Sequence, residues 1–150
     1  MKLQVGEVFA IQTKIGFGFL QYVDTGNLGI EIVRVLEPIK DTNEINQLEV
    51  ELPERFTIQF VVKAALRKKI LIKTGIFKIP EFYKIPVKAR TEHFIRGEFI
   101  AWHIVNQQTL KIESKKALSE DDLLISPHGI PNDTLLIERL ENNWRLEQWK

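Results

Sequence analysis

Three β-prone runs fill the first 36 residues of this 150-residue chain, and they constrain its fold more than any other feature. Residues 5–14, 17–23 and 28–36 are rich in β-branched and aromatic side chains. The two short separators contain glycine, asparagine and aspartate, which tolerate the positive φ of tight turns. The sequence therefore predicts three sequential antiparallel strands, with Gly16 or Gly18 at a positive φ or in a β-bulge.

Further β-prone runs follow in the middle of the chain. We expect additional strands in four segments, at residues 55–65, 70–77, 98–105 and 109–114. Helix formers occupy residues 64–69, but six residues cannot sustain a helix alone.

Two polar or proline-containing connections separate these runs. Residues 37–54 contain Pro38 near their start and Pro53 near their end, and are predicted to form a polar excursion with one helical turn at residues 43–48. Pro80 and Pro86 make residues 78–90 an extended connection, because proline cannot donate to the ladder of a central strand.

Helix signals replace strand signals toward the end of the chain. Ser119 followed by Asp122 is typical of a helix N-cap with an acid at its third position. The Pro131-Asn132-Asp133 segment predicts the start of a second helix, whose apolar residues form one stripe. Residues 145–149 alternate and are interpreted as a returning edge strand.

Strands first and helices last predict an α+β fold in one globular domain over residues 1–150. We expect an N-terminal antiparallel β-meander, as a curved sheet or partial barrel, with further strands and one or two short helices near the C-terminus. The predicted core consists of nine large apolar residues: Phe9, Ile11, Phe19, Ile32, Phe60, Ile72, Trp102, Leu136 and Leu140.

Cysteine is absent, which excludes disulfides, thiolate metal sites and cysteine nucleophiles. The three histidines do not fall at metal-ligand spacing, and no phosphate-binding loop or nucleophile elbow occurs. Ser126, His128 and Asp133 are close in sequence, but a rigid loop before a helix explains them better than a catalytic triad. We therefore expect no catalytic residue, no metal, no cofactor and no enzymatic activity.

The start of the chain and its hydropathy predict the compartment. Glu7 interrupts the N-terminus before the apolar region of a signal peptide could form. No apolar run approaches the roughly 20 residues that a membrane helix needs. We therefore expect a cytoplasmic protein that has no membrane partner.

Charge is segregated along the chain although the net charge is only +1. Residues 37–54 carry six acids and one lysine, residues 63–90 carry nine bases and one acid, and residues 120–147 carry seven acids and two arginines. These stretches either pack as neighbours and solvate their own elements, or form a docking surface that steers a partner.

Two other functions stay open from the residues alone. The basic stretch, with Phe77, Phe82 and Tyr83 nearby, could bind nucleic acid, although the near-neutral net charge makes nucleic acid an unlikely partner. A pocket near Trp102 and His103 could instead belong to an enzyme or a small-ligand sensor.

The N-terminal motif resembles a known family. Val5-Gly6-Glu7-Val8-Phe9-Ala10-Ile11, followed by Gly16-Phe17-Gly18-Phe19-Leu20-Gln21, is similar to the start of bacterial immunity protein 26, a family of polymorphic toxin systems. The resemblance implies a cytoplasmic bacterial protein that binds and neutralises a cognate toxin as a stoichiometric inhibitor, without cofactor or turnover.

The charge pattern then suggests where such a toxin would bind. Many toxin domains act on nucleic acid and present basic clefts, which an acidic surface can plug. We therefore predict toxin contacts through solvated carboxylates, first at Glu44, Glu49 and Glu51 and second at Asp121 and Asp122.

Overall fold

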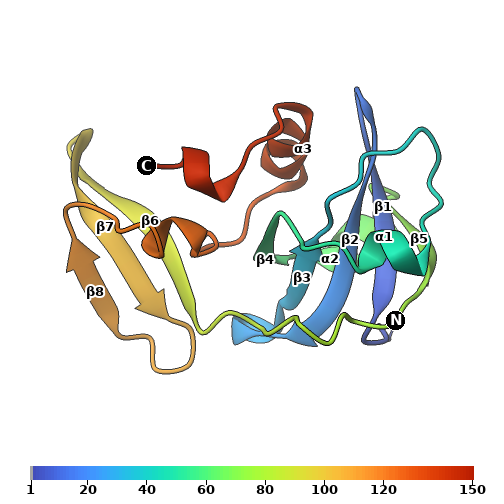
Figure 1. Ribbon diagram of the computed structural model, residues 1–150, viewed down its shortest axis with the longest axis horizontal. Coiled ribbons are helices and arrows are strands. Elements are labelled where there is room, and N and C mark those ends of the chain that lie inside the picture. Colours follow the sequence, from blue (N-terminus) through green and yellow to red (C-terminus); the bar gives the residue numbers. More distant parts are fainter. Residues whose placement is uncertain (1) are drawn as a thin grey trace.

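Residues 2–150 are described by a computed structural model, in which eight strands form two antiparallel sheets (Figure 1). The first sheet has the order β4-β3-β2-β1-β5 and the second has the order β6-β7-β8. The strands are β1 (Glu7–Thr13), β2 (Gly16–Thr25), β3 (Glu31–Val35), β4 (Phe56–Phe60), β5 (Leu71–Ile76), β6 (Lys88–Ile95), β7 (Glu98–Asn106) and β8 (Ile112–Lys115).

The predicted N-terminal meander is confirmed. Strands β1, β2 and β3 pair in sequence order, and Gly16 has a φ of +133° at the turn between β1 and β2. A Cβ atom at Gly16 would lie 2.7 Å from the carbonyl oxygen of Lys40, so both the backbone angle and the space require glycine. The α+β class is confirmed as well, and within residues 2–150 neither sheet closes into a barrel.

Both faces of the first sheet are covered. One face packs against α2 (Val62–Arg67) and α3 (Asp133–Glu141) through alternate apolar side chains, which form the larger core cluster. The opposite face packs against α1 (Gln47–Val50) and the segment around it, forming a smaller cluster.

Two expectations about helices in this half of the chain were wrong. The α2 helix forms although it has only six residues. Val62 and Ala65 are buried in the larger core, and this tertiary packing provides the stability that so short a helix lacks by itself. The single turn predicted at residues 43–48 begins later, at Gln47, where Asn46 and Glu49 form a capping box.

The extended connection continues from β5 to the start of β6 and runs along one side of the molecule in Figure 1. Strand β6 itself was not predicted. It forms a hairpin with β7 through Arg96 and Gly97, whose φ angles of 51° and 81° are those of a two-residue turn.

The C-terminal elements are partly as predicted. Asn132 caps α3 by accepting a hydrogen bond from the Leu135 amide, at the predicted position. Ser119 and Asp122 exchange the predicted capping hydrogen bonds, but only the 3₁₀ turn η2 (Asp122–Leu124) follows.

The predicted edge strand at residues 145–149 was wrong. The segment forms the 3₁₀ turn η3 (Leu146–Gln148), because its carbonyl groups are bound by the side chain of Arg90. In Figure 1 the chain after η2 crosses to α3, which lies beside the first sheet, and its end turns back toward the second sheet.

Seven of the nine predicted core residues are buried: Phe9, Ile11, Phe19, Phe60, Trp102, Leu136 and Leu140. Ile32 is half-buried, and Ile72 is 41% exposed. The error at Ile72 is a one-residue slip, because Leu71 pairs with Ile11 and takes the inward position. No helix within residues 2–150 has the length and apolar character to cross a membrane.

Candidate functional site

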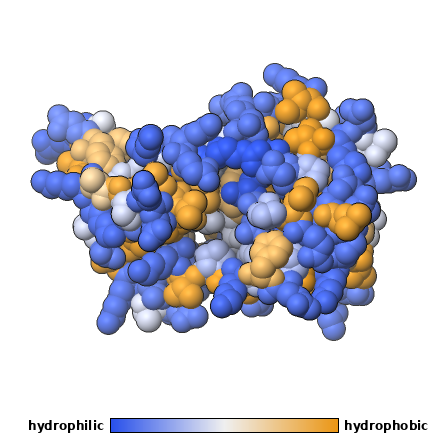
Figure 2. Space-filling view, viewed as in Figure 1, coloured by the Kyte–Doolittle hydropathy of each residue, from blue (hydrophilic) through white to orange (hydrophobic). Residues whose placement is uncertain are grey.

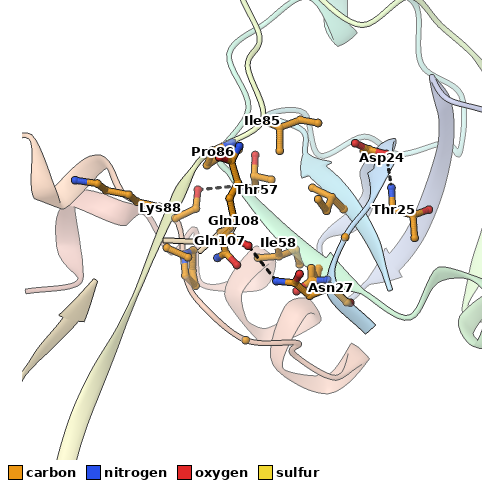
Figure 3. Close-up of a pocket in the computed structure, with 17 residues that line it drawn as sticks. Asp24, Thr25, Asn27, Thr57, Ile58, Ile85, Pro86, Lys88, Gln107 and Gln108 are labelled. Carbon is orange, nitrogen blue, oxygen red and sulfur yellow. Dashed lines mark hydrogen bonds between the residues drawn. The ribbon is translucent and has the colours of Figure 1, made fainter. Parts of the chain in front are cut away.

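A cleft of about 510 Å³ opens where the two sheets meet. Its walls come from the end of β2 and the two residues after it, from β3 and β4, from the end of the β5–β6 connection and the start of β6, from the turn between β7 and β8, and from residues 126–129 (Figure 3). The lining combines apolar residues with seven uncharged polar side chains: Thr25, Asn27, Thr57, Gln59, Gln107, Gln108 and Ser126.

Hydrogen bonds across this inter-sheet cleft tie its walls together. The Asn27 amide donates to the Gln107 carbonyl at 3.3 Å (Figure 3), which joins the first sheet to the β7–β8 turn. The Ser126 hydroxyl accepts from the backbone amide of Thr57 at 3.0 Å. Asp24 and Lys88 are the charged lining residues, and Asp24 already accepts from the Thr25 amide. The cleft therefore offers amides and hydroxyls to a neutral polar ligand, and its lining lacks a nucleophile paired with a base.

A second concavity lies on the second sheet, and we name it the aromatic groove. It encloses about 530 Å³ and is lined by Glu92, Phe94, Phe99, Trp102, Lys116, Ala117, Leu118, Leu123 and Lys150. Its floor is a chain of edge-to-face contacts, with ring centroids 5.9 Å apart for Phe94–Phe99 and 5.8 Å apart for Phe99–Trp102. The pocket expected near Trp102 therefore exists, although His103 does not line it.

The β6–β7 hairpin tip beside the groove is exposed and apolar. Phe94, Ile95, Phe99 and Ile100 have exposed fractions between 41% and 51%. Figure 2 shows apolar side chains gathered at this end of the molecule. Sequence reasoning missed this surface. The signal that could have found it is a Phe-Ile pair on each side of the turn at Arg96-Gly97, at residues 94–95 and 99–100.

The five predicted toxin-contact residues fall into two separate places. Glu44, Glu49 and Glu51 lie on or beside α1, whereas Asp121 and Asp122 lie at η2, near the second sheet (Figure 1). Glu44 and Asp121 are exposed, and within residues 2–150 neither belongs to an ion pair.

The other three carboxylates are not free in solvent, contrary to the expectation. Glu49 is half-buried, lies 2.7 Å from Lys40 Nζ and closes the capping box of α1. Glu51 accepts a hydrogen bond from the Gln47 side chain. Asp122 is buried and lies 2.9 Å from Lys115 Nζ. Its backbone hydrogen bond from Ser119, together with Lys115, lowers the pKa of the Asp122 carboxyl.

Half of the acids in residues 37–54 are neutralised inside the fold. Glu37 pairs with Arg145, Glu49 with Lys40 and Glu54 with Arg34, and none of these cations belongs to the basic stretch. The basic and acidic stretches therefore do not cancel each other through ion pairs within the described part of the chain.

The nucleic-acid alternative gains little from the aromatic residues near the basic stretch. Phe77 packs against the smaller core cluster, and the Tyr83 ring lies against the Arg34 guanidinium. Only Phe82, which is 55% exposed, is available for base stacking.

Two histidines that are distant in sequence come together on the second sheet. The rings of His93 and His103 stack with centroids 4.4 Å apart, because β6 and β7 are paired there. Among residues 2–150, no group of three or more histidine, aspartate or glutamate side chains is arranged to hold a metal ion. The His pair is therefore a cross-strand contact of this sheet.

The buried polar cluster around Arg34 is structural. Arg34 donates to the Gln21 side chain at 2.6 Å and to Glu54 at 2.9 Å, and it lies 5.2 Å from the Tyr83 ring centroid. Within residues 2–150, every buried side-chain nitrogen or oxygen has a hydrogen-bond partner. This cluster therefore holds the β3–β4 connection, through Val50 and Leu52, and the β5–β6 connection, through Tyr83, against the first sheet. Its buried polar groups are paired within the protein and are not available to a ligand.

Comparison of the chain with protein-family models, curated proteins and solved structures finds no match.

Proposed function

We propose that this protein is an immunity protein that binds a cognate bacterial toxin and neutralises it as a stoichiometric inhibitor. The observation that carries the proposal is the exposed apolar surface formed by the β6–β7 hairpin tip and the aromatic groove. Exposed apolar surface that is continuous with a concave site marks a binding surface rather than a stabilising feature of the fold.

The composition of this surface supports a protein partner. Phenylalanine and tryptophan are enriched where protein interfaces are buried, and aromatic anchors dominate their binding energy. The N-terminal Gly-Glu-Val-Phe-Ala-Ile motif supports the same class through its resemblance to immunity protein 26, and it lies in β1 of the first sheet.

The acidic residues have a secondary role in this proposal. Glu44 and Asp121 are the exposed, unpaired carboxylates of the predicted set, so they are free to attract a basic toxin over a distance. Glu49, Glu51 and Asp122 already bind groups of their own chain and would contribute less.

Co-expression with a candidate toxin domain, sought in the neighbouring reading frames, tests the proposal. Cells carrying the toxin domain alone should die, and cells that also carry this protein should survive. Purified protein and toxin domain should bind at a 1:1 ratio in calorimetry. Death of the co-expressing cells together with absence of binding would contradict the proposal.

A second candidate function rests on the inter-sheet cleft. Its 510 Å³ volume lies within the range of small-molecule sites, and its lining provides neutral donors and acceptors. A neutral polar compound that raises the melting temperature of the protein, but not that of a Gln59→Leu variant, would support this function. A compound library that never raises the melting temperature would contradict it.

A further inference from the structure

The edge of the second sheet is incomplete beside the aromatic groove. Strand β8 pairs only with residues Trp102–Val105 of β7, so residues 98–101 extend past its end with no strand on that side within residues 2–150. Figure 1 shows the β6–β7 hairpin reaching beyond the tip of β8. An open edge of this kind can accept an extended segment from another protein.

The chain itself leaves this position free. After Lys115 it departs from the sheet, and Lys116, Ala117 and Leu118 cross to line the aromatic groove instead of continuing along β7. A strand added beside residues 98–101 would therefore run next to the groove. Because side chains alternate along a strand, every second side chain of that strand would face the groove.

The charges at the groove favour an acidic segment. Lys116 and Lys150 line it, and within residues 2–150 neither lysine forms an ion pair. The one carboxylate of the lining, Glu92, already accepts a hydrogen bond from the Trp149 indole at 3.0 Å. At the hairpin tip, Arg96 is exposed and adjoins the acidic Glu98. Glu92 keeps its negative charge, so the lining carries two cations and one anion, and the two lysines favour an acidic side chain of a partner.

The ring geometry favours an inserted side chain over a stacked nucleic-acid base. Phe94, Phe99 and Trp102 contact one another edge to face, so the rings do not form a row of parallel open faces. Base stacking on single strands requires open aromatic faces. An aliphatic or aromatic side chain can enter the groove between the rings and Leu118 or Leu123.

We infer that the toxin docks by adding an extended segment to the open edge of β7, with an apolar side chain in the aromatic groove and an acidic side chain against Lys116 and Lys150. This inference rests on the proposed function, because it names the part of the partner that the same surface binds.

The test measures affinity for the toxin domain that this protein neutralises in co-expression, by calorimetry in four single variants. Phe99→Asp should weaken binding at least about 30-fold, the loss typical of a central anchor. Phe82→Asp changes a phenylalanine on the β5–β6 connection that is 55% exposed, against 43% for Phe99, and this variant should bind as the unchanged protein does. Lys116→Glu should weaken binding, and Lys68→Glu on the first-sheet side should not. Melting temperatures of all four check that the fold is kept.

Hydrogen exchange distinguishes strand addition from side-chain contact alone. In the complex, amides of residues 98–101 that do not pair with β6 should exchange more slowly than in the free protein. If the toxin domain binds and protects cells, but Phe99→Asp binds equally well and these amides are unchanged, the inference is wrong while the proposed function stands. If the unchanged protein neither binds nor protects, both are wrong. If Lys116→Glu abolishes binding of single-stranded oligothymidylate but not of the toxin domain, the groove binds nucleic acid instead.

Discussion

The guanidinium carbon of Arg90 lies 4.3 Å from the ring centroid of Trp149, which is one residue from the end of the described chain. The same guanidinium lies 4.9 Å from the centroid of Trp102, and it donates to the carbonyls of four residues: Leu123, Ile125, Leu146 and Trp149. Burial lowers the pKa of Arg90 to about 10, so it is still a cation at neutral pH. One buried cation therefore fastens η2, η3 and the chain end to β6.

Replacing this arginine should loosen the whole C-terminal segment. Arg90→Lys keeps the charge but loses the planar fork that reaches four carbonyls, and we expect the free energy of unfolding to fall by about 2–4 kcal/mol. Urea denaturation measures this loss. Arg139→Lys is the matched control, because Arg139 lies 4.3 Å from the Trp144 ring but is only half-buried, and it should cost less than about 1 kcal/mol. Equal losses in both variants would contradict the role assigned to Arg90.

The register of β5 can be tested with two neighbouring residues. Leu71→Ala should lower the free energy of unfolding by about 2–5 kcal/mol, because Leu71 is 3% exposed and lies in the larger core. Ile72→Ala should change it by less than about 1 kcal/mol, because Ile72 is 41% exposed. The two variants remove comparable side chains from adjacent positions. The reverse order in urea denaturation would show that the strand pairs one residue out of register.

Local patterns were sufficient for elements that pair with their neighbours in sequence. The β1–β2–β3 meander and the cap at Asn132 depend on residues close together in the chain, so alternation and capping chemistry predict them. The 3₁₀ turn near the end of the chain, which depends on a distant partner, was missed. The turn at Leu146 depends on Arg90, which is 56 residues away.

The candidate site was predictable only in part for the same reason. Trp102 stood out as a large apolar residue in a strand, and the groove is indeed built on it. Its other walls come from β6 and from the segment after β8. Strand β6 was not predicted because Pro80 and Pro86, which precede it, favoured an extended connection there. Ion pairs such as Glu49 with Lys40 are side-chain contacts that a count of charges cannot reveal.

Tyr83 should titrate late in the folded protein. Its burial raises the pKa of the phenol to about 12 from an ordinary value of 10. Because the unfolded chain then loses the proton more readily than the folded one, stability should fall as the pH rises from about 10 to about 12. Absorbance at the tyrosinate band should show a late phase that Tyr83→Phe removes, and the variant should lose less stability over this pH range. A single early phase in the folded protein would contradict the burial of this phenol.

Acid should weaken the η2 region through Asp122. The hydrogen bond from the Ser119 amide and the contact with Lys115 hold the pKa of this carboxyl below its ordinary value of 3.8. Its contribution is therefore complete above that value and is lost as the pH falls through the lower pKa of the folded state. Asp122→Asn should lower the melting temperature at pH 6 and reduce the further drop between pH 4 and pH 2. An unchanged drop would assign the acid sensitivity to other carboxylates, such as Glu37, whose pKa is also lowered by Arg145.

Glu44 and Glu49 separate the docking and structural roles of the acidic segment. Glu49→Lys removes the capping box at Asn46 and the contact with Lys40, so the free energy of unfolding should fall by about 1 kcal/mol. Glu44→Lys changes an exposed carboxylate without an ion pair, so the melting temperature should stay the same. If Glu44 steers a basic toxin, its reversal should slow association at low salt and have less effect at high salt, because salt screens exposed charges. Stopped-flow association at two salt concentrations measures this difference. An association rate that is unchanged at both concentrations would remove Glu44 from the docking surface and leave Asp121 and the aromatic groove as the remaining contacts.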